Sequence, residues 1–199
     1  DVALASSGLL SAKMGGPGVF PPQPDGCMDL GQHRKTWKAS GGEDRFRRAA
    51  YTYRWRNTPH PALKVFDAPA GLAACTRRIR SNTPLQALTL MNDPAFVELA
   101  LGLAKRLMAE ADSAAKRIRL GFRLCLGREP DAEELRLLTG LVESQRSEFA
   151  ERPAEAEAVV AKSKPLGQTT QPASSNTELA AWTMAARVLL NLDETITRE

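Results

Sequence analysis

The chain has 199 residues, of which 43% are hydrophobic and 25% charged, an ordinary composition for one large globular domain or two small ones. No run of about 18 apolar residues occurs, so we expect no membrane span. The start of the chain, Asp1 to Ala5, lacks an initiator Met and the basic segment of a signal peptide. We therefore expect residues 1–199 to be a single domain cut from a longer protein.

The charge is unevenly distributed. Residues 1–80 carry 13 Lys and Arg against 6 Asp and Glu, whereas residues 81–199 carry 14 against 17. The basic half also holds seven of the eleven aromatic residues. Basic and aromatic residues together are typical of a nucleic-acid or polyanion surface, but they also allow the two halves to attract each other. Because no nucleic-acid motif accompanies the charge, we favour attraction between the halves and expect no nucleic-acid partner.

The basic half has little periodicity. Residues 1–10 resemble the end of a helix, and residues 11–42 are rich in glycine and proline, which disfavour helices and strands. Residues 43–57 fit either a helix or a strand, and we favour a helix because acids precede arginines along it. We expect the long loop to pack along the domain through its apolar residues, which are Val19, Phe20, Met28, Leu30 and Trp37.

The second half predicts helices with clear starts. Thr83 and Asp93 each precede a proline, an arrangement typical of an N-cap followed by the first helical residue. Asp131 has Glu134 three residues later, as in a capping box. The pattern predicts helices over 84–91, 94–111 and 113–126, with Gly127 as the terminator, and then over 131–151.

The end of the chain completes the predicted fold. Residues 153–161 predict a weak helix, residues 162–176 a flexible polar linker, and residues 177–192 a helix with a buried Trp182. The sequence thus predicts a mainly α fold, in which a loop-rich half (1–80) packs on a helical bundle (81–199).

The sharpest polar cluster is Arg77, Arg78 and Arg80. Arginine forks suit carboxylates, phosphates and sulfates, so these residues are candidates for binding an anion or a partner. They also suit a structural clamp that pairs with Asp67, Asp93 or backbone carbonyls, and we favour the clamp because an irregular region has many carbonyls to satisfy. Asp67 and Asn82 flank the cluster and are included as candidates.

No catalytic constellation or metal motif is evident. His60 lies between two prolines, where it is suited to be a ligand or a base, although a structural role is favoured. Cys75 lies beside arginines, as reactive cysteines often do, but no base is near it in sequence. The odd number of cysteines, Cys27, Cys75 and Cys125, leaves open whether a disulfide forms. We therefore expect no catalytic residue, no metal site and no cofactor within this chain.

A set of short motifs occurs in a fixed order along the chain. The motifs are Met14-Gly15-Gly16-Pro17, Phe20-Pro21-Pro22-Gln23-Pro24, Asp44-Arg45-Phe46-Arg47-Arg48, Phe66-Asp67-Ala68-Pro69, Cys75-Thr76-Arg77-Arg78, Asn82-Thr83-Pro84-Leu85-Gln86-Ala87-Leu88, Asn92-Asp93-Pro94, Leu126-Gly127-Arg128-Glu129-Pro130 and Asn191-Leu192-Asp193-Glu194. Together they resemble the C-terminal domain of unknown function of large planctomycete proteins, a planctomycete-specific PSD-type domain. Cys75 and the arginines after it match that pattern, whereas Cys27 and Cys125 depart from it.

The resemblance implies an exported protein of the periplasm or cell envelope, in which haem, where present, belongs to an upstream cytochrome-c-type domain. Our leading hypothesis is a non-catalytic interaction or scaffold domain that docks on an upstream domain or an envelope partner. The first alternative is binding or degradation of an anionic, sulfated polysaccharide through the arginines and His60. The second is an accessory role to a haem electron-transfer module.

Overall fold

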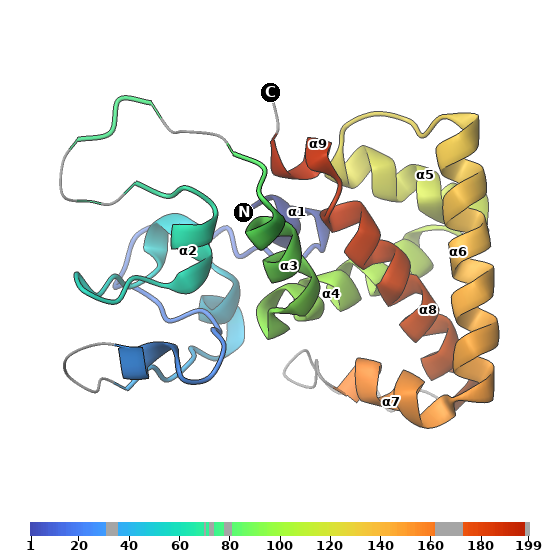
Figure 1. Cartoon of the computed structure of the whole chain (residues 1–199), viewed down its shortest axis with the longest axis horizontal. Helices are drawn as coiled ribbons and strands as arrows, with labels where there is room; N and C mark the ends of the chain where they lie inside the picture. The colour runs from blue at the N-terminus through green and yellow to red at the C-terminus, as the bar shows by residue number, and fades with distance from the viewer. Residues whose placement is uncertain (31–35, 70, 72–73, 78–80, 162–172, 198–199) are drawn as a thin grey trace.

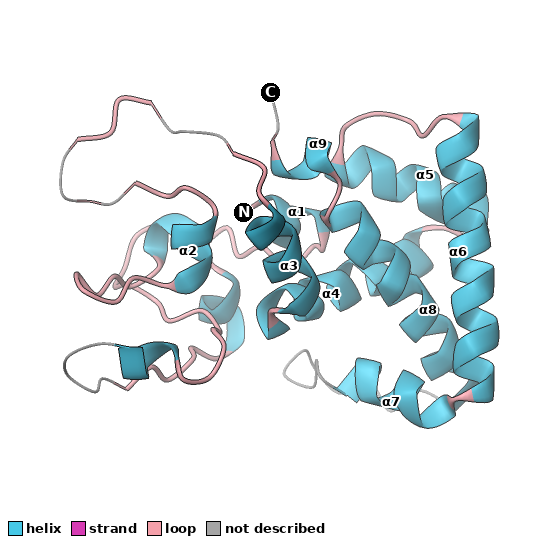
Figure 2. Ribbon diagram, in the orientation of Figure 1, coloured by secondary structure: helices cyan, strands magenta, loops and turns pink. Residues whose placement is uncertain are grey.

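The computed structural model describes residues 1–30, 36–69, 71, 74–77, 81–161 and 173–197, and these residues are mainly helical (Figures 1 and 2). Apart from two isolated bridges, they form no β-structure. The predicted fold class is therefore confirmed. The helices are α1 (Val2–Ser6), α2 (Pro61–Val65), α3 (Pro84–Asn92), α4 (Pro94–Glu110), α5 (Ala114–Cys125), α6 (Ala132–Glu151), α7 (Pro153–Ala161), α8 (Ala173–Leu190) and α9 (Asp193–Ile196).

The predicted helix starts are confirmed. The Thr83 hydroxyl accepts from the Gln86 backbone N–H at 3.3 Å, and the Gln86 side chain accepts from the Thr83 backbone N–H at 2.9 Å, which makes a capping box. Asp93 caps α4 by accepting from Ala95 N–H at 2.9 Å. Asp131 caps α6 in a second capping box with Glu134. Local side-chain chemistry therefore sets these helix boundaries.

The core of the helical half is built around α8, which packs against α4, α6 and α7 (Figure 1). Small residues on α8, among them Ala180, Ala181 and Ala186, are fully buried and allow its neighbours to approach closely. Trp182 is also fully buried, and its indole N–H donates to Glu178 Oε1 at 2.8 Å. The buried Trp182 predicted from the sequence is thus confirmed, and its single polar atom is satisfied.

The predicted boundary between the linker and the last helix needs correction. The last helix begins at Ala173, four residues before the predicted start at Thr177, so the final part of the expected 162–176 linker is helical. Serine and asparagine in that stretch imitate linker composition, although they are compatible with a helix that tertiary packing stabilises. The remaining linker residues, 162–172, lie outside the described residues.

The loop-rich half is held by long-range contacts. Residues 11–19 pair with residues 47–52 through two isolated parallel bridges, Ser11 with Arg47 and Val19 with Thr52. The predicted helix over 43–57 is wrong: the segment forms two short 3-10 turns, Gly42–Phe46 and Ala49–Tyr51, joined by extended residues. The bridges fix those extended residues, so tertiary pairing overrides the helical charge pattern.

The expected anchoring of the long loop is confirmed for several of its apolar residues. Val19 is buried. Phe20 stacks on Tyr53 with ring centroids 4.9 Å apart and meets Trp37 edge-on at 5.1 Å. The Trp37 indole N–H also donates to the Pro21 carbonyl at 2.7 Å. The described part of the loop therefore packs through Phe20 against Tyr53.

Within the described part of the chain, no single helix is long and apolar enough to cross a membrane. Only α3 and α4 taken together, bent by 67° at their junction, have the length and composition that such a span requires.

Candidate functional site

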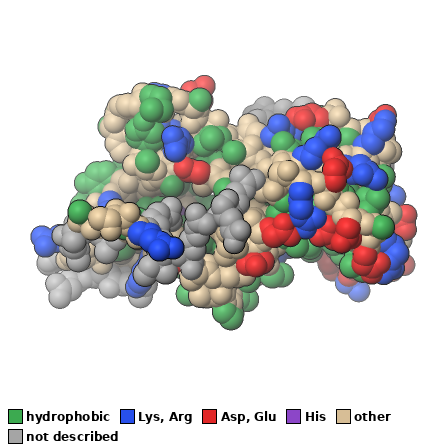
Figure 3. Space-filling view, turned by 90° about the horizontal axis from the view of Figure 1, so that it is seen from above, with side chains coloured by type: hydrophobic (Ala, Val, Ile, Leu, Met, Phe, Trp, Pro, Cys, Tyr) green, Lys and Arg blue, Asp and Glu red, His purple; other side chains and the backbone are tan. Residues whose placement is uncertain are grey.

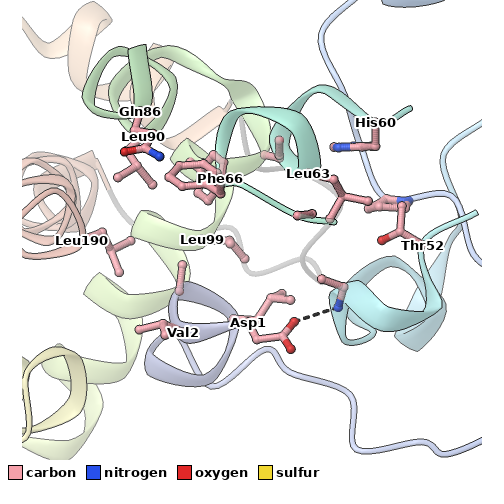
Figure 4. Close-up of a pocket in the computed structure, with 18 of the residues that line it drawn as sticks. Asp1, Val2, Thr52, His60, Leu63, Phe66, Gln86, Leu90, Leu99 and Leu190 are labelled. Carbon is pink, nitrogen blue, oxygen red and sulfur yellow. Dashed lines mark hydrogen bonds between the residues drawn. The ribbon is translucent and has the colours of Figure 1, made fainter. Parts of the chain in front are cut away.

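A cleft of about 1130 Å³ opens between the loop-rich half and the helical half. Its walls come from α1, α2, α3, α4, the end of α8 and α9, together with the 3-10 turns of the loop-rich half. Figure 4 shows Phe66, Leu90, Leu99 and Leu190, which come from different elements, arranged around this space. A large, mainly apolar hollow with a few polar groups is the usual form of a ligand site.

A buried ion pair lies in the lining of the cleft. The Arg45 guanidinium donates to both carboxylate oxygens of Glu98, with N–O distances of 2.8 to 3.2 Å. The Glu98 side chain is 4% exposed and that of Arg45 is 17% exposed. Because Arg45 lies in the loop-rich half and Glu98 on α4, this fork joins the two halves across the cleft.

Arg47 organises the neighbouring wall. It is 4% exposed, its guanidinium lies 3.7 Å from the centroid of the Tyr51 ring, and it donates to the backbone carbonyls of Lys13, Gly15 and Pro17. Sequence analysis missed both Arg45 and Arg47, although both lie in one of the motifs that carry the family resemblance. Their spacing alone gives no sign of partners more than thirty residues away.

His60 lies inside the cleft wall and is 5% exposed. Its Nε2 is 2.9 Å from the Pro22 carbonyl oxygen, which can only accept, so Nε2 carries the proton. Burial lowers the pKa of His60, and this outweighs the opposite effects of the Pro22 hydrogen bond and of Asp93. The imidazole is thus a neutral structural donor, which agrees with the favoured role.

Asp67 anchors a hydrogen-bond network on another wall. Its Oδ2 accepts from the Ser81 hydroxyl at 2.5 Å and from the Gln86 amide at 3.4 Å. The Gln86 amide also donates to Ser81 Oγ at 3.0 Å and to the Val65 carbonyl at 3.0 Å. Asp67 has a φ of 55°, a left-handed conformation that Asp tolerates better than most residues. The network fixes α3 against the end of α2.

The predicted site residues do not all lie at the cleft. Arg77 is exposed and lines the cleft with His60 and Asp67, so three of the six candidates meet there. Arg78 and Arg80 lie outside the described residues. Asn82 is exposed, does not line the cleft, and donates to Asp193 Oδ1 at 2.5 Å.

The proposed clamp partners of the arginines are engaged elsewhere. Asp67 accepts from Ser81 and Gln86, and Asp93 caps α4. Burial raises the pKa of Asp93, with the Ala95 N–H and His60 acting in the opposite direction. Among the described residues, Arg77 forms no hydrogen bond or ion pair through its guanidinium.

None of the three cysteines forms a disulfide: Cys125 is buried, Cys27 is half-buried and Cys75 is exposed. Burial raises the pKa of Cys27, and the nearby carboxylates of Asp93 and Asp25 raise it further. In the described part of the chain, no group of three His, Cys, Asp or Glu residues is placed to hold a metal ion.

A second surface feature lies on the outer face of α3. Leu85, Leu88 and Met91 are 59%, 56% and 44% exposed, and they recur every three residues along one face of this helix. The opposite face carries the buried Gln86 and Leu90, which face the cleft. Acidic and basic side chains are intermixed over the helical part at the right of Figure 3.

Comparison with known protein families gives a match. The family model described as PSD1, protein of unknown function (DUF1553), matches residues 1–142. This range includes both walls of the cleft that come from the loop-rich half and from α2 to α4. No curated protein and no solved structure matches the chain.

Proposed function

Since this chain belongs to the PSD1 family of proteins of unknown function, we propose from its own surface that it is a protein-interaction module that docks through the outer face of α3. The observation that carries this proposal is the exposed row formed by Leu85, Leu88 and Met91. Three large apolar side chains at helical spacing match the pattern by which one helix lies in the apolar groove of a partner.

The inner side of α3 supports the proposal, because it holds the helix in place before any partner binds. The capping box fixes the first turn, and the Gln86 amide ties that turn to Val65 and Ser81. A helix fixed in this way loses little conformational entropy on docking. The exposed row is therefore presented on a preorganised support.

The partner that we propose is an upstream domain of the same polypeptide or another envelope protein, and the location is the periplasm or cell envelope. The resemblance of the ordered motifs to the C-terminal domain of exported planctomycete proteins supports this part of the proposal. Binding of an anionic polysaccharide is favoured less, because the cleft lining is mainly apolar and His60, one of its proposed site residues, is buried and bonded to Pro22.

A photocrosslinking amino acid at Leu88 tests docking in the full-length parent protein. We expect a discrete crosslinked product, formed within the chain for an upstream domain and at higher mass for a separate partner. A probe at Leu137, which is 56% exposed on α6, is the matched control and should give no discrete product. Serine at both Leu85 and Met91 should abolish the product at Leu88 without changing stability by more than about 1 kcal/mol, which is about 0.5 kcal/mol for each surface substitution. Equal crosslinking from the two probes would contradict docking through α3.

A further inference from the structure

The cleft has room and apolar surface for a small molecule. Its volume, about 1130 Å³, lies slightly above the range of roughly 300–1,000 Å³ that is typical of small-molecule sites. The apolar lining combines two aromatic rings, Phe66 and Phe96, whose centroids are 5.6 Å apart, with aliphatic side chains from four helices. The aliphatic side chains are Leu63, Leu90, Leu99 and Leu190.

The acidic groups in the lining already have donors. Glu98 accepts from Arg45, and Asp67 accepts from Ser81 and Gln86. Asp1 Oδ1 accepts from the Ala49 backbone N–H at 2.7 Å, the bond drawn in Figure 4. A cationic ligand would therefore have to displace existing hydrogen bonds, and each such exchange reduces its net gain.

The cationic groups in the lining differ from one another. Arg45 is paired with Glu98, and Arg47 is surrounded by carbonyls and the Tyr51 ring. Arg77 is the exception, because its guanidinium has no partner among the described residues. It is exposed while also lining the cleft, which places it at the mouth. Among its described lining residues, the cleft thus combines an apolar interior with one available positive charge at its opening.

We infer that the cleft binds an amphipathic monoanion, with its apolar body between Phe66, Leu99 and Leu190 and its carboxylate on Arg77. A guanidinium fork matches a carboxylate with two parallel hydrogen bonds. The one available cation among the described lining residues suits one negative charge. This site is on the inner side of α3, so the inference is independent of docking through the outer face.

Isothermal titration calorimetry with dodecanoate, below its micelle concentration, tests the site. Arg77→Gln should weaken binding about tenfold, because it removes one charge-assisted interaction. Arg56→Gln is the matched control, since Arg56 is exposed in the same half and does not line the cleft. Dodecanol has the same alkyl body without the charge, and its affinity should be unchanged by Arg77→Gln.

A second variant tests the interior of the cleft. Leu63→Trp adds bulk to the lining and should abolish dodecanoate binding, while circular dichroism and thermal unfolding report whether the variant still folds. The inference is overturned if dodecanoate shows no saturable binding to the wild-type protein. It is also overturned if Arg77→Gln binds dodecanoate as tightly as Arg56→Gln, or if folded Leu63→Trp binds it as tightly as the wild type.

Discussion

Replacing Arg45 tests whether one buried ion pair fixes the loop-rich half to the helical half. Arg45→Met preserves most of the side-chain volume and leaves Glu98, with a side chain that is 4% exposed, without its cation. Removing one partner from a buried pair typically costs about 3–5 kcal/mol, mainly because the remaining charge is desolvated. Since Arg45 is itself 17% exposed and water can reach the site, we expect a loss of about 3 kcal/mol in the free energy of unfolding.

The double variant Arg45→Met with Glu98→Leu separates the charge from the packing. Apolar replacement of both partners is often close to neutral, so the double variant should be more stable than Arg45→Met alone. Guanidinium unfolding followed by both tryptophan fluorescence and circular dichroism measures these differences. Lys13→Ala is the control, because the Lys13–Asp44 pair is 52% and 42% exposed and should contribute less than about 1 kcal/mol. A loss below about 1 kcal/mol for Arg45→Met would refute the reasoning. So would a double variant whose loss of stability equals the sum of the losses for Arg45→Met and Glu98→Leu measured singly.

Three further predictions concern pH and packing. Burial lowers the pKa of His60 below its ordinary 6.5, so as the pH falls the imidazole is protonated in the unfolded chain before it is protonated in the folded one. The free energy of unfolding should therefore fall as the pH drops through 6.5. Urea midpoints measured between pH 7.5 and 5 should show this fall, and His60→Gln should flatten it. Hydrogen bonds from Arg128 lower the pKa of Glu134 to about 2. The ionised carboxylate therefore contributes stability above its ordinary pKa of 4.5, and this contribution is lost as the pH falls towards 2. In Arg128→Ala, NMR titration should show the pKa of Glu134 rising towards 4.5. An added Cβ at Gly121 would lie 2.6 Å from Leu189 Cδ1, so Gly121→Ala should cost about 1–3 kcal/mol, whereas Gly140→Ala, with nothing within 4 Å, should gain about 0.5–1 kcal/mol in thermal unfolding.

The helices after residue 80 were predictable because their signals are local. Thr83, Asp93 and Asp131 each bond a backbone N–H no more than three residues away, so the sequence alone contains both partners. The same reasoning fails at residues 173–176, which are helical although their serine and asparagine are typical of a linker. Packing of α8 as a whole against α6 and α7, rather than local composition, stabilises this helix.

The loop-rich half was less predictable because its order depends on distant residues. Arg47 bonds carbonyls more than thirty positions away, and Val19 exchanges two backbone hydrogen bonds with Tyr51 and Tyr53, at 2.8 and 2.7 Å. Neither contact leaves a periodic pattern in the sequence. The charge pattern of residues 43–57 resembled a helix, although Arg45 and Arg47 serve tertiary contacts instead.

The candidate site was predicted in part for the same reason. His60, Asp67 and Arg77 were selected for their chemistry, and the structure places all three along the cleft. Glu98 was overlooked because one acid on an apolar helix resembles a surface residue until its partner is known. A polar residue at a position that the helical period assigns to the core was the available signal, since burial of a charge requires a partner.

Gln86 connects the two faces of α3 on which the proposals depend. The same side chain accepts from Thr83 N–H, which starts the helix, and donates to Val65 and Ser81, which belong to the preceding segment. The hydrogen bonds of one side chain, Gln86, therefore both start the helix and attach it to the cleft wall. Only a short part of α3 follows Gln86, and the helix fixes the angle between its residues. The direction of Leu88 on the outer face therefore follows from the contacts that Gln86 makes on the cleft side. Docking and ligand binding would thus use opposite faces of one helix whose orientation is set from within the cleft.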